Sequence, residues 1–204
     1  MYTWDRDIQA GIWSIPHVSD PQPSNVFQGH ITFKRRYSTA PIVIVWLTGF
    51  DFETHRQVEI QASVTNVTTT SFEIKIKTGP ETLLYWASTS WIAYYSDTPR
   101  IKSGSYSTRD VRPTTEPKLC DSGKVDFAGE QFPWAPTVLV GINEFHFDGS
   151  QGTSIRCVAK TSHVTEAGFN WELNSWEDGA KYLVGASYLA LDNGPPTPVG
   201  DVNL

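Results

Sequence analysis

The feature that most constrains the fold is an internal repeat, because the 204-residue chain is written approximately twice. The string APIVIVW at 40–46 returns as APTVLVG at 135–141, at an offset of 95 residues. Farther along, an offset of 97 relates Ala62 to Ala159, Phe72 to Phe169 and Tyr85 to Tyr182. Offsets that drift by a few residues indicate small insertions in loops. The repeat therefore predicts two duplicated domains, residues 1–97 and 98–204, with a boundary near Asp97 to Arg100.

Hydrophobic residues recur with a period of two, which is typical of half-buried strands. Phe72, Ile74 and Ile76, for example, alternate with charged residues. In the first half we expect strands near 7–13 and at 31–37, 42–50, 57–67, 70–77 and 84–95, and about six strands in each half. Short antiparallel strands with one polar face must bury the other face against a second sheet. The predicted fold is all-β: two tandem six-stranded antiparallel β-sandwiches.

The inward positions of these strands predict the core of each sandwich. In the first half they are Phe33, Val43, Val45, Ile60, Phe72, Ile74 and Trp91. In the second half the corresponding positions are Phe127, Val138, Val140, Cys157, Phe169, Trp171 and Tyr188.

Charge and hydropathy restrict the possible partners. Sixteen Lys and Arg against 22 Asp and Glu give a net charge of -6, which repels nucleic acid, so no nucleic-acid partner is expected. No apolar run approaches the roughly 18 residues that a spanning helix needs, and the first residues lack the pattern of a secretory signal. We therefore expect a cytoplasmic or non-classically secreted protein.

Metal, cofactor and catalytic motifs are not recognisable in the sequence. The five histidines show no ligand spacing, so neither a metal nor another cofactor is expected. The two cysteines, Cys120 and Cys157, are interpreted as buried thiols, with one disulfide as the alternative. No nucleophile elbow, P-loop or zinc-protease motif is present, and we do not expect an enzyme. A glycoside hydrolase using an acid pair such as Glu144 and Asp148 stays an alternative.

The order of short strings along each half resembles the H-type lectin domain of snail agglutinins and of the C-terminal part of discoidins. The first half reads QAG at 9–11, ITF at 31–33 and SWIA at 90–93, and the second reads KSG at 102–104, VDF at 125–127 and SYLA at 187–190. The resemblance covers nearly the whole chain. It implies a sandwich that binds galactose-type sugars, N-acetylgalactosamine above all, in a shallow site between neighbouring domains of a trimer.

The resemblance also implies particular site residues. The family's arginine, tryptophan and tyrosine positions correspond to Arg156, Trp176 and Tyr182 in the second half. In the first half the same positions hold Glu59, Gly79 and Tyr85, which predicts a degenerate site there. The family's acidic residue corresponds to Glu116, with Asp110 as the alternative, and Glu177 stands where some snail agglutinins carry histidine.

The residue types fit this chemistry independently of the resemblance. A sugar offers C–H groups on one face and hydroxyls at its edge, so its site needs an aromatic face and polar groups. Trp176 lies in a polar loop where an indole can lie against a ligand. Arg156 is expected to point outward and to offer its planar donor fork to hydroxyls. Solvated or core positions for these side chains are the alternative interpretation.

The sequence thus predicts a lectin for glycans that end in galactose or N-acetylgalactosamine, acting multivalently as an agglutinin. A homotrimer is the expected assembly, with a dimer as the alternative. A third function, a protein-interaction module that docks through Trp134 and Trp176, stays open at this point.

Overall fold

The computed structural model describes residues 8–23, 25–53, 55–149, 152 and 154–195. The first half of this part of the chain forms six strands: β1 (Ile8–Ser14), β2 (Val26–Thr32), β3 (Ile42–Phe52), β4 (Gln57–Thr65), β5 (Ser71–Thr78) and β6 (Leu84–Tyr94). The second half forms six more and one short 3-10 helix: β7 (Ile101–Ser107), η2 (Thr108–Asp110), β8 (Cys120–Asp126), β9 (Thr137–Asp148), β10 (Val158–Ser162), β11 (Gly168–Asn174) and β12 (Lys181–Leu191).

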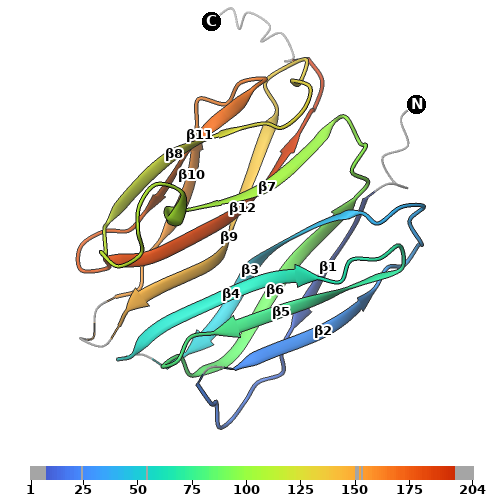
Figure 1. Ribbon diagram of the computed structural model, residues 1–204. Coiled ribbons are helices and arrows are strands. Elements are labelled where there is room, and N and C mark those ends of the chain that lie inside the picture. The colour runs from blue at the N-terminus through green and yellow to red at the C-terminus, as the bar shows by residue number, and fades with distance from the viewer. Residues whose placement is uncertain (1–7, 24, 54, 150–151, 153, 196–204) are drawn as a thin grey trace, which may run out of the picture.

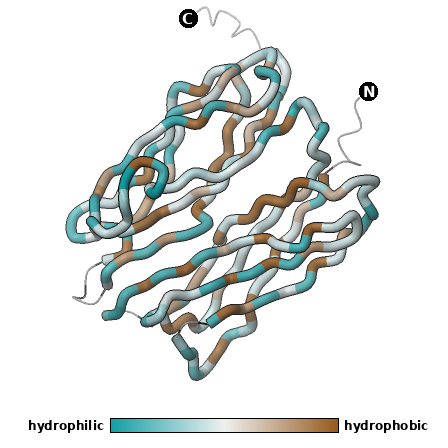
Figure 2. The backbone as a smooth tube through the Cα atoms, in the orientation of Figure 1, coloured by the Kyte–Doolittle hydropathy of each residue, from teal (hydrophilic) through white to brown (hydrophobic). Residues whose placement is uncertain are grey.

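Each half is a β-sandwich, as the sequence predicts. In the first, the sheet β1-β6-β3 faces the strands β2-β5-β4, and in the second, β7-β12-β9 face the sheet β10-β11-β8 (Figure 1). All strand pairs are antiparallel. Hydrophobic and hydrophilic residues alternate along strands such as β5, whereas β3 begins with the apolar run IVIV (Figure 2). The fold class is therefore confirmed, and the boundary expected near Asp97 to Arg100 lies between β6 and β7.

The expected core is filled largely as the repeat predicts. Ten of the fourteen predicted positions are buried, and they include the equivalent pair Phe72 and Phe169 at 0% and 1% exposure. The other four are partly buried and pack against the same cluster: Val43, Val138, Val140 and Cys157. Rings meet edge to face in both sandwiches, as in the pair Phe72 and Trp91 at 5.0 Å.

The two sandwiches share one sheet. Residues Gln57–Gln61 of β4 pair with Glu144–Asp148 of β9, so the order β2-β5-β4-β9-β12-β7 is continuous across both halves. Beside this ladder, Ser187 Oγ donates to the Val45 carbonyl at 2.9 Å. A second apolar cluster, built on Ile44, Tyr94, Ile101 and Leu189, packs the halves together. The halves are therefore joined by hydrogen bonds as well as by apolar contact.

Two expectations about local structure are wrong. The strand expected at 31–37 lies at Val26–Thr32 instead. Phe33 and Tyr37 are buried without belonging to it, and their backbone N–H groups donate to the Thr70 and Thr69 carbonyls just before β5, the neighbour of β2 in the same sheet. Cys120, expected as a buried thiol, is exposed at the start of β8.

Cys157 is half-buried, and both cysteines are free thiols. Burial raises the pKa of the Cys157 thiol to about 11. A thiol with so high a pKa is mostly protonated near neutral pH and is a weak nucleophile, which favours a packing role for this side chain.

Candidate H-type lectin site

Trp176 lies at the tip of the loop between β11 and β12. The Ser175 N–H donates to the Leu119 carbonyl at 2.7 Å, and the Gly179 N–H donates to the Trp176 carbonyl at 3.2 Å. Glu177 takes up a left-handed backbone conformation with φ of 56°, which tightens the turn. The Trp176 side chain is 47% exposed, so the indole is not folded into the core. The loop therefore presents an aromatic face to solvent.

Arg156 is joined to this loop by ion pairs. It lies just before β10, and its Nη1 is 2.6 Å from Glu177 Oε2 and 2.9 Å from Asp178 Oδ1. The arginine side chain is 28% exposed, whereas the two carboxylates are 69% and 51% exposed. Ion pairs this open to water contribute little to stability, about 0–1 kcal/mol. They do join Arg156 to the two residues that follow Trp176 in the loop.

Tyr182 lies apart from this group, at the junction of the two halves. Its ring is 4.8 Å from the His146 ring, and His146 stands opposite Glu59 in the β4–β9 ladder. Burial lowers the pKa of His146, and the carboxylates of Glu59, Asp148 and Glu81 oppose that shift. The described contacts thus place Tyr182 with His146 and not with Arg156 or Trp176.

Glu116 and Asp110 occupy different places in the segment between β7 and β8. The Glu116 carbonyl accepts from Arg112 Nη1 at 2.7 Å, and its side chain is exposed. Asp110 caps η2, where its Oδ2 accepts from the Ser107 N–H at 2.7 Å. This capping gives Asp110 a structural role, whereas Glu116 keeps its carboxylate in solvent.

A buried charge cluster, which the sequence analysis missed, organises this region. Arg112 donates through Nε and Nη2 to the two oxygens of Asp121, at 2.7 Å and 3.1 Å. Lys181, fully buried at 0% exposure, lies 2.9 Å from the same carboxylate. Burial raises the pKa of Asp121, but hydrogen bonds from Arg112 and Lys181 outweigh it and hold the pKa below its usual range.

The cluster also connects the candidate residues. Arg112 Nη1 donates both to the Glu116 carbonyl and to the Tyr182 carbonyl, at 2.7 Å and 3.2 Å. No local signal could reveal this cluster, because Arg112 and Lys181 lie 69 residues apart and meet only in the folded chain. It fixes the segment before β8 against the start of β12.

The corresponding positions of the first half are arranged differently. A Cβ placed on Gly79 would lie 2.6 Å from both Cβ and Oε2 of Glu59. An aromatic side chain at position 79 therefore has no room while Glu59 keeps its place. Tyr85 is the one position of the set that holds the same residue in both halves, and its hydroxyl donates to Glu53 Oε2 at 2.8 Å.

Comparison with known protein families decides the relationship. The model of the H-type lectin domain matches residues 28–94 and again 122–191, which together make up more than half of the chain. The chain belongs to the H-type lectin family. This membership makes it a carbohydrate-binding lectin, and the H-type lectin domain is a binding domain rather than a catalytic one. No match was found among curated proteins or among solved structures.

Within the described ranges, no three His, Cys, Asp or Glu residues are grouped so that they could hold a metal ion. None of the helices found there is long and apolar enough to cross a membrane.

Proposed function

We propose that this H-type lectin binds glycans ending in galactose or N-acetylgalactosamine through the second half of the chain. The observation that carries the proposal is that Arg156 pairs with Glu177, the residue that follows the exposed Trp176 in the same loop. The indole offers a face to the sugar C–H groups, and the guanidinium and carboxylate offer donors and acceptors to its hydroxyls. Glu116 is a further acceptor candidate, because its carboxylate is exposed.

The first half has neither of the two decisive groups. Glu59 replaces the arginine and Gly79 replaces the tryptophan, and Glu59 fills the space that a side chain at position 79 would need. We therefore propose one sugar site per chain, with a degenerate counterpart in the first half. Tyr182 is proposed as a member of the site that lies farther from Arg156 and Trp176. Its ring packs against His146 at the junction of the two halves.

We expect Arg156→Ala and Trp176→Ala each to weaken binding of methyl α-N-acetylgalactosaminide by about 1–3 kcal/mol. Each substitution removes one kind of contact, and neither side chain lies in the core. Glu59→Ala is the matched control and should change the affinity little. Calorimetric titration measures the affinities, and thermal melts show whether the variants stay folded. Wild-type affinity in both variants would contradict the proposed site.

We also propose that the lectin acts as an oligomer, a homotrimer in preference to a dimer. A single exposed site binds a sugar weakly, whereas linked sites gain avidity of about 10²- to 10⁴-fold. Light scattering should then give a mass near three times the 22.8 kDa of one chain. A mass of 22.8 kDa at the concentration used for agglutination would reject the oligomer.

A further inference from the structure

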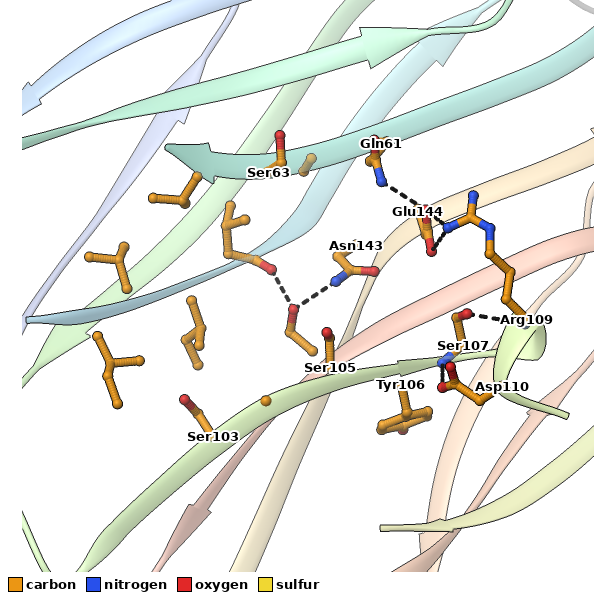
Figure 3. Close-up of a pocket in the computed structure, with 18 residues that line it drawn as sticks. Gln61, Ser63, Ser103, Ser105, Tyr106, Ser107, Arg109, Asp110, Asn143 and Glu144 are labelled. Atoms are coloured by element: carbon orange, nitrogen blue, oxygen red, sulfur yellow. Dashed lines mark hydrogen bonds and ion pairs between the residues drawn. The ribbon is translucent and has the colours of Figure 1, made fainter. Parts of the chain in front are cut away.

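A groove of about 610 Å³ lies between the two sandwiches (Figure 3). The β4–β9 ladder ends at Gln61, and β4 continues to Thr65 paired with β5 alone. Strands β3 and β4 form one wall of the groove, and β7, β9 and β12 form the other. Its volume falls in the range of about 300–1,000 Å³ that small-molecule pockets span. Of the six candidate site residues from the sequence, all of them described, Asp110 alone lines it.

Asn143 lines this groove with its amide already fixed by the fold. Its Nδ2 donates to Ser187 Oγ at 2.9 Å, and Ser187 Oγ in turn donates to the Val45 carbonyl at 2.9 Å. Because the single hydroxyl proton of Ser187 is used in that bond, Oγ can only accept from Asn143, and this fixes the orientation of the amide. Among the described residues, Asn143 Oδ1 is then buried without a partner. A Cβ placed on Gly185 would lie 3.0 Å from this oxygen, so the oxygen lies against β12 and is closed to solvent.

The polar end of the groove is held in place by a bridge between the halves. Glu144, whose side chain is 10% exposed, accepts from Gln61 Nε2 at 2.9 Å and from Arg109 Nη1 at 3.0 Å and 3.1 Å. Arg109 is 51% exposed, and its other guanidinium nitrogens make no bond to the described residues. The bridge therefore orders the site before a ligand arrives and leaves donors available to it.

The remaining lining combines hydroxyls with aliphatic side chains. Ser63 comes from β4, and Ser103 and Ser105 come from β7; the hydroxyls of Ser63 and Ser105 have no bonding partner in the described chain. The aliphatic lining comes from Ile42–Val45 on β3 and from Val64. In Figure 3 the carbon-only side chains gather at one end of the groove, near Ser63 and Ser103, and Gln61, Glu144 and Arg109 lie at the other. At the apolar cluster built on Ile44 and Leu189 the same two halves are closely packed.

The charges of the lining select against anionic ligands. One basic residue, Arg109, stands beside two acidic ones, Glu144 and Asp110, and Arg109 already pairs with Glu144. An anion such as a phosphate would meet no excess of positive charge. The groove instead offers donors, acceptors, hydroxyls and an aliphatic strip, which match the edge and the C–H surface of a sugar.

We propose that this groove is a second ligand site, specific for a neutral saccharide. Ser63, Ser105, Gln61 and Arg109 surround its hydroxyls. The site is separate from the one built on Arg156 and Trp176, and each can bind without the other.

The test uses the full chain carrying Arg156→Ala, so that the contribution of the site proposed above is reduced. Lactose, maltose and diacetylchitobiose are titrated as neutral probes, and 3′-sialyllactose serves as the acidic counterpart of lactose. Ser105→Trp is the blocking variant, because Ser105 is exposed and its hydroxyl makes no hydrogen bond in the described chain. Ser122→Trp is the matched control: Ser122 is also an exposed strand serine of the second half, but it lies on β8 outside the groove.

We expect at least one neutral disaccharide to bind the Arg156→Ala chain, Ser122→Trp to leave that binding unchanged, and Ser105→Trp to abolish it. Lactose should bind more tightly than 3′-sialyllactose. Three results would overturn the proposal: no neutral disaccharide bound to the Arg156→Ala chain, undiminished binding after Ser105→Trp, or a preference for the acidic probe. If the proposed site at Arg156 and Trp176 is wrong, a chain without Ser105→Trp should instead bind methyl α-N-acetylgalactosaminide with the same affinity whether or not it carries Arg156→Ala.

Discussion

Replacing Arg112 by alanine should lower the free energy of unfolding by about 3–5 kcal/mol, although the residue lies in an irregular segment. The guanidinium and Asp121 are each 5% exposed and bonded at 2.7 Å and 3.1 Å. Removing Arg112 leaves the Asp121 carboxylate buried with Lys181 as its remaining cation. It also frees the Glu116 and Tyr182 carbonyls. Urea unfolding followed by tryptophan fluorescence measures the loss.

Lys124→Ala is the matched control, because Lys124 pairs with Asp126 while both side chains are 63% and 72% exposed. This variant should stay within about 0.5 kcal/mol of the parent.

The pKa of Asp121 gives a second readout. A carboxylate whose pKa is lowered in the folded protein adds stability above its unfolded pKa, near 3.8, and that stability is lost as the pH falls through the folded pKa. Arg112→Ala should reduce this acid dependence; equal losses in both variants would contradict the buried cluster.

Truncation of Phe72 to alanine should cost about 3–5 kcal/mol, and truncation of Phe169 should cost a similar amount. The two rings occupy equivalent positions and are 0% and 1% exposed, each with aromatic neighbours. Each substitution removes the burial of a whole ring and leaves a cavity among side chains that can relax only in part.

Val26→Ala is the control for these core variants, since Val26 is 54% exposed on β2 and should change stability by less than about 0.5 kcal/mol. Urea titration of all three variants gives the comparison. A cost below 1 kcal/mol at either phenylalanine would mean that this half does not depend on its aromatic core. Because one sheet runs through both halves, we also expect each variant to shift a single transition that both halves share.

The sequence was informative where the repeat aligned one half with the other. The offset of 97 residues paired Phe72 with Phe169, and both are buried in equivalent places. It was misleading at 31–37, because Phe33 and Tyr37 are apolar enough to suggest a strand but are held by bonds to the Thr70 and Thr69 carbonyls. A period of two reports burial and cannot tell which backbone groups pair.

Contacts between the halves could not be anticipated from local pattern. The ladder between β4 and β9 joins residues more than 80 positions apart, such as Gln61 and Glu144, and nothing near either residue marks the partner. The same holds for Arg112 with Lys181. The sequence did place Trp176 in an exposed loop, because a tryptophan among polar residues and a glycine has no strand face to occupy. It did not anticipate that Glu177 and Asp178 would bind Arg156.

The measurement that tests the account most directly is a glycan array probed with the intact chain and with the Arg156→Ala, Trp176→Ala double variant. We expect the intact chain to select glycans that end in galactose or N-acetylgalactosamine, and the double variant to lose most of that signal while it stays folded. Retention of the full signal in the double variant, or selection of glycans without these terminal sugars, would contradict the account.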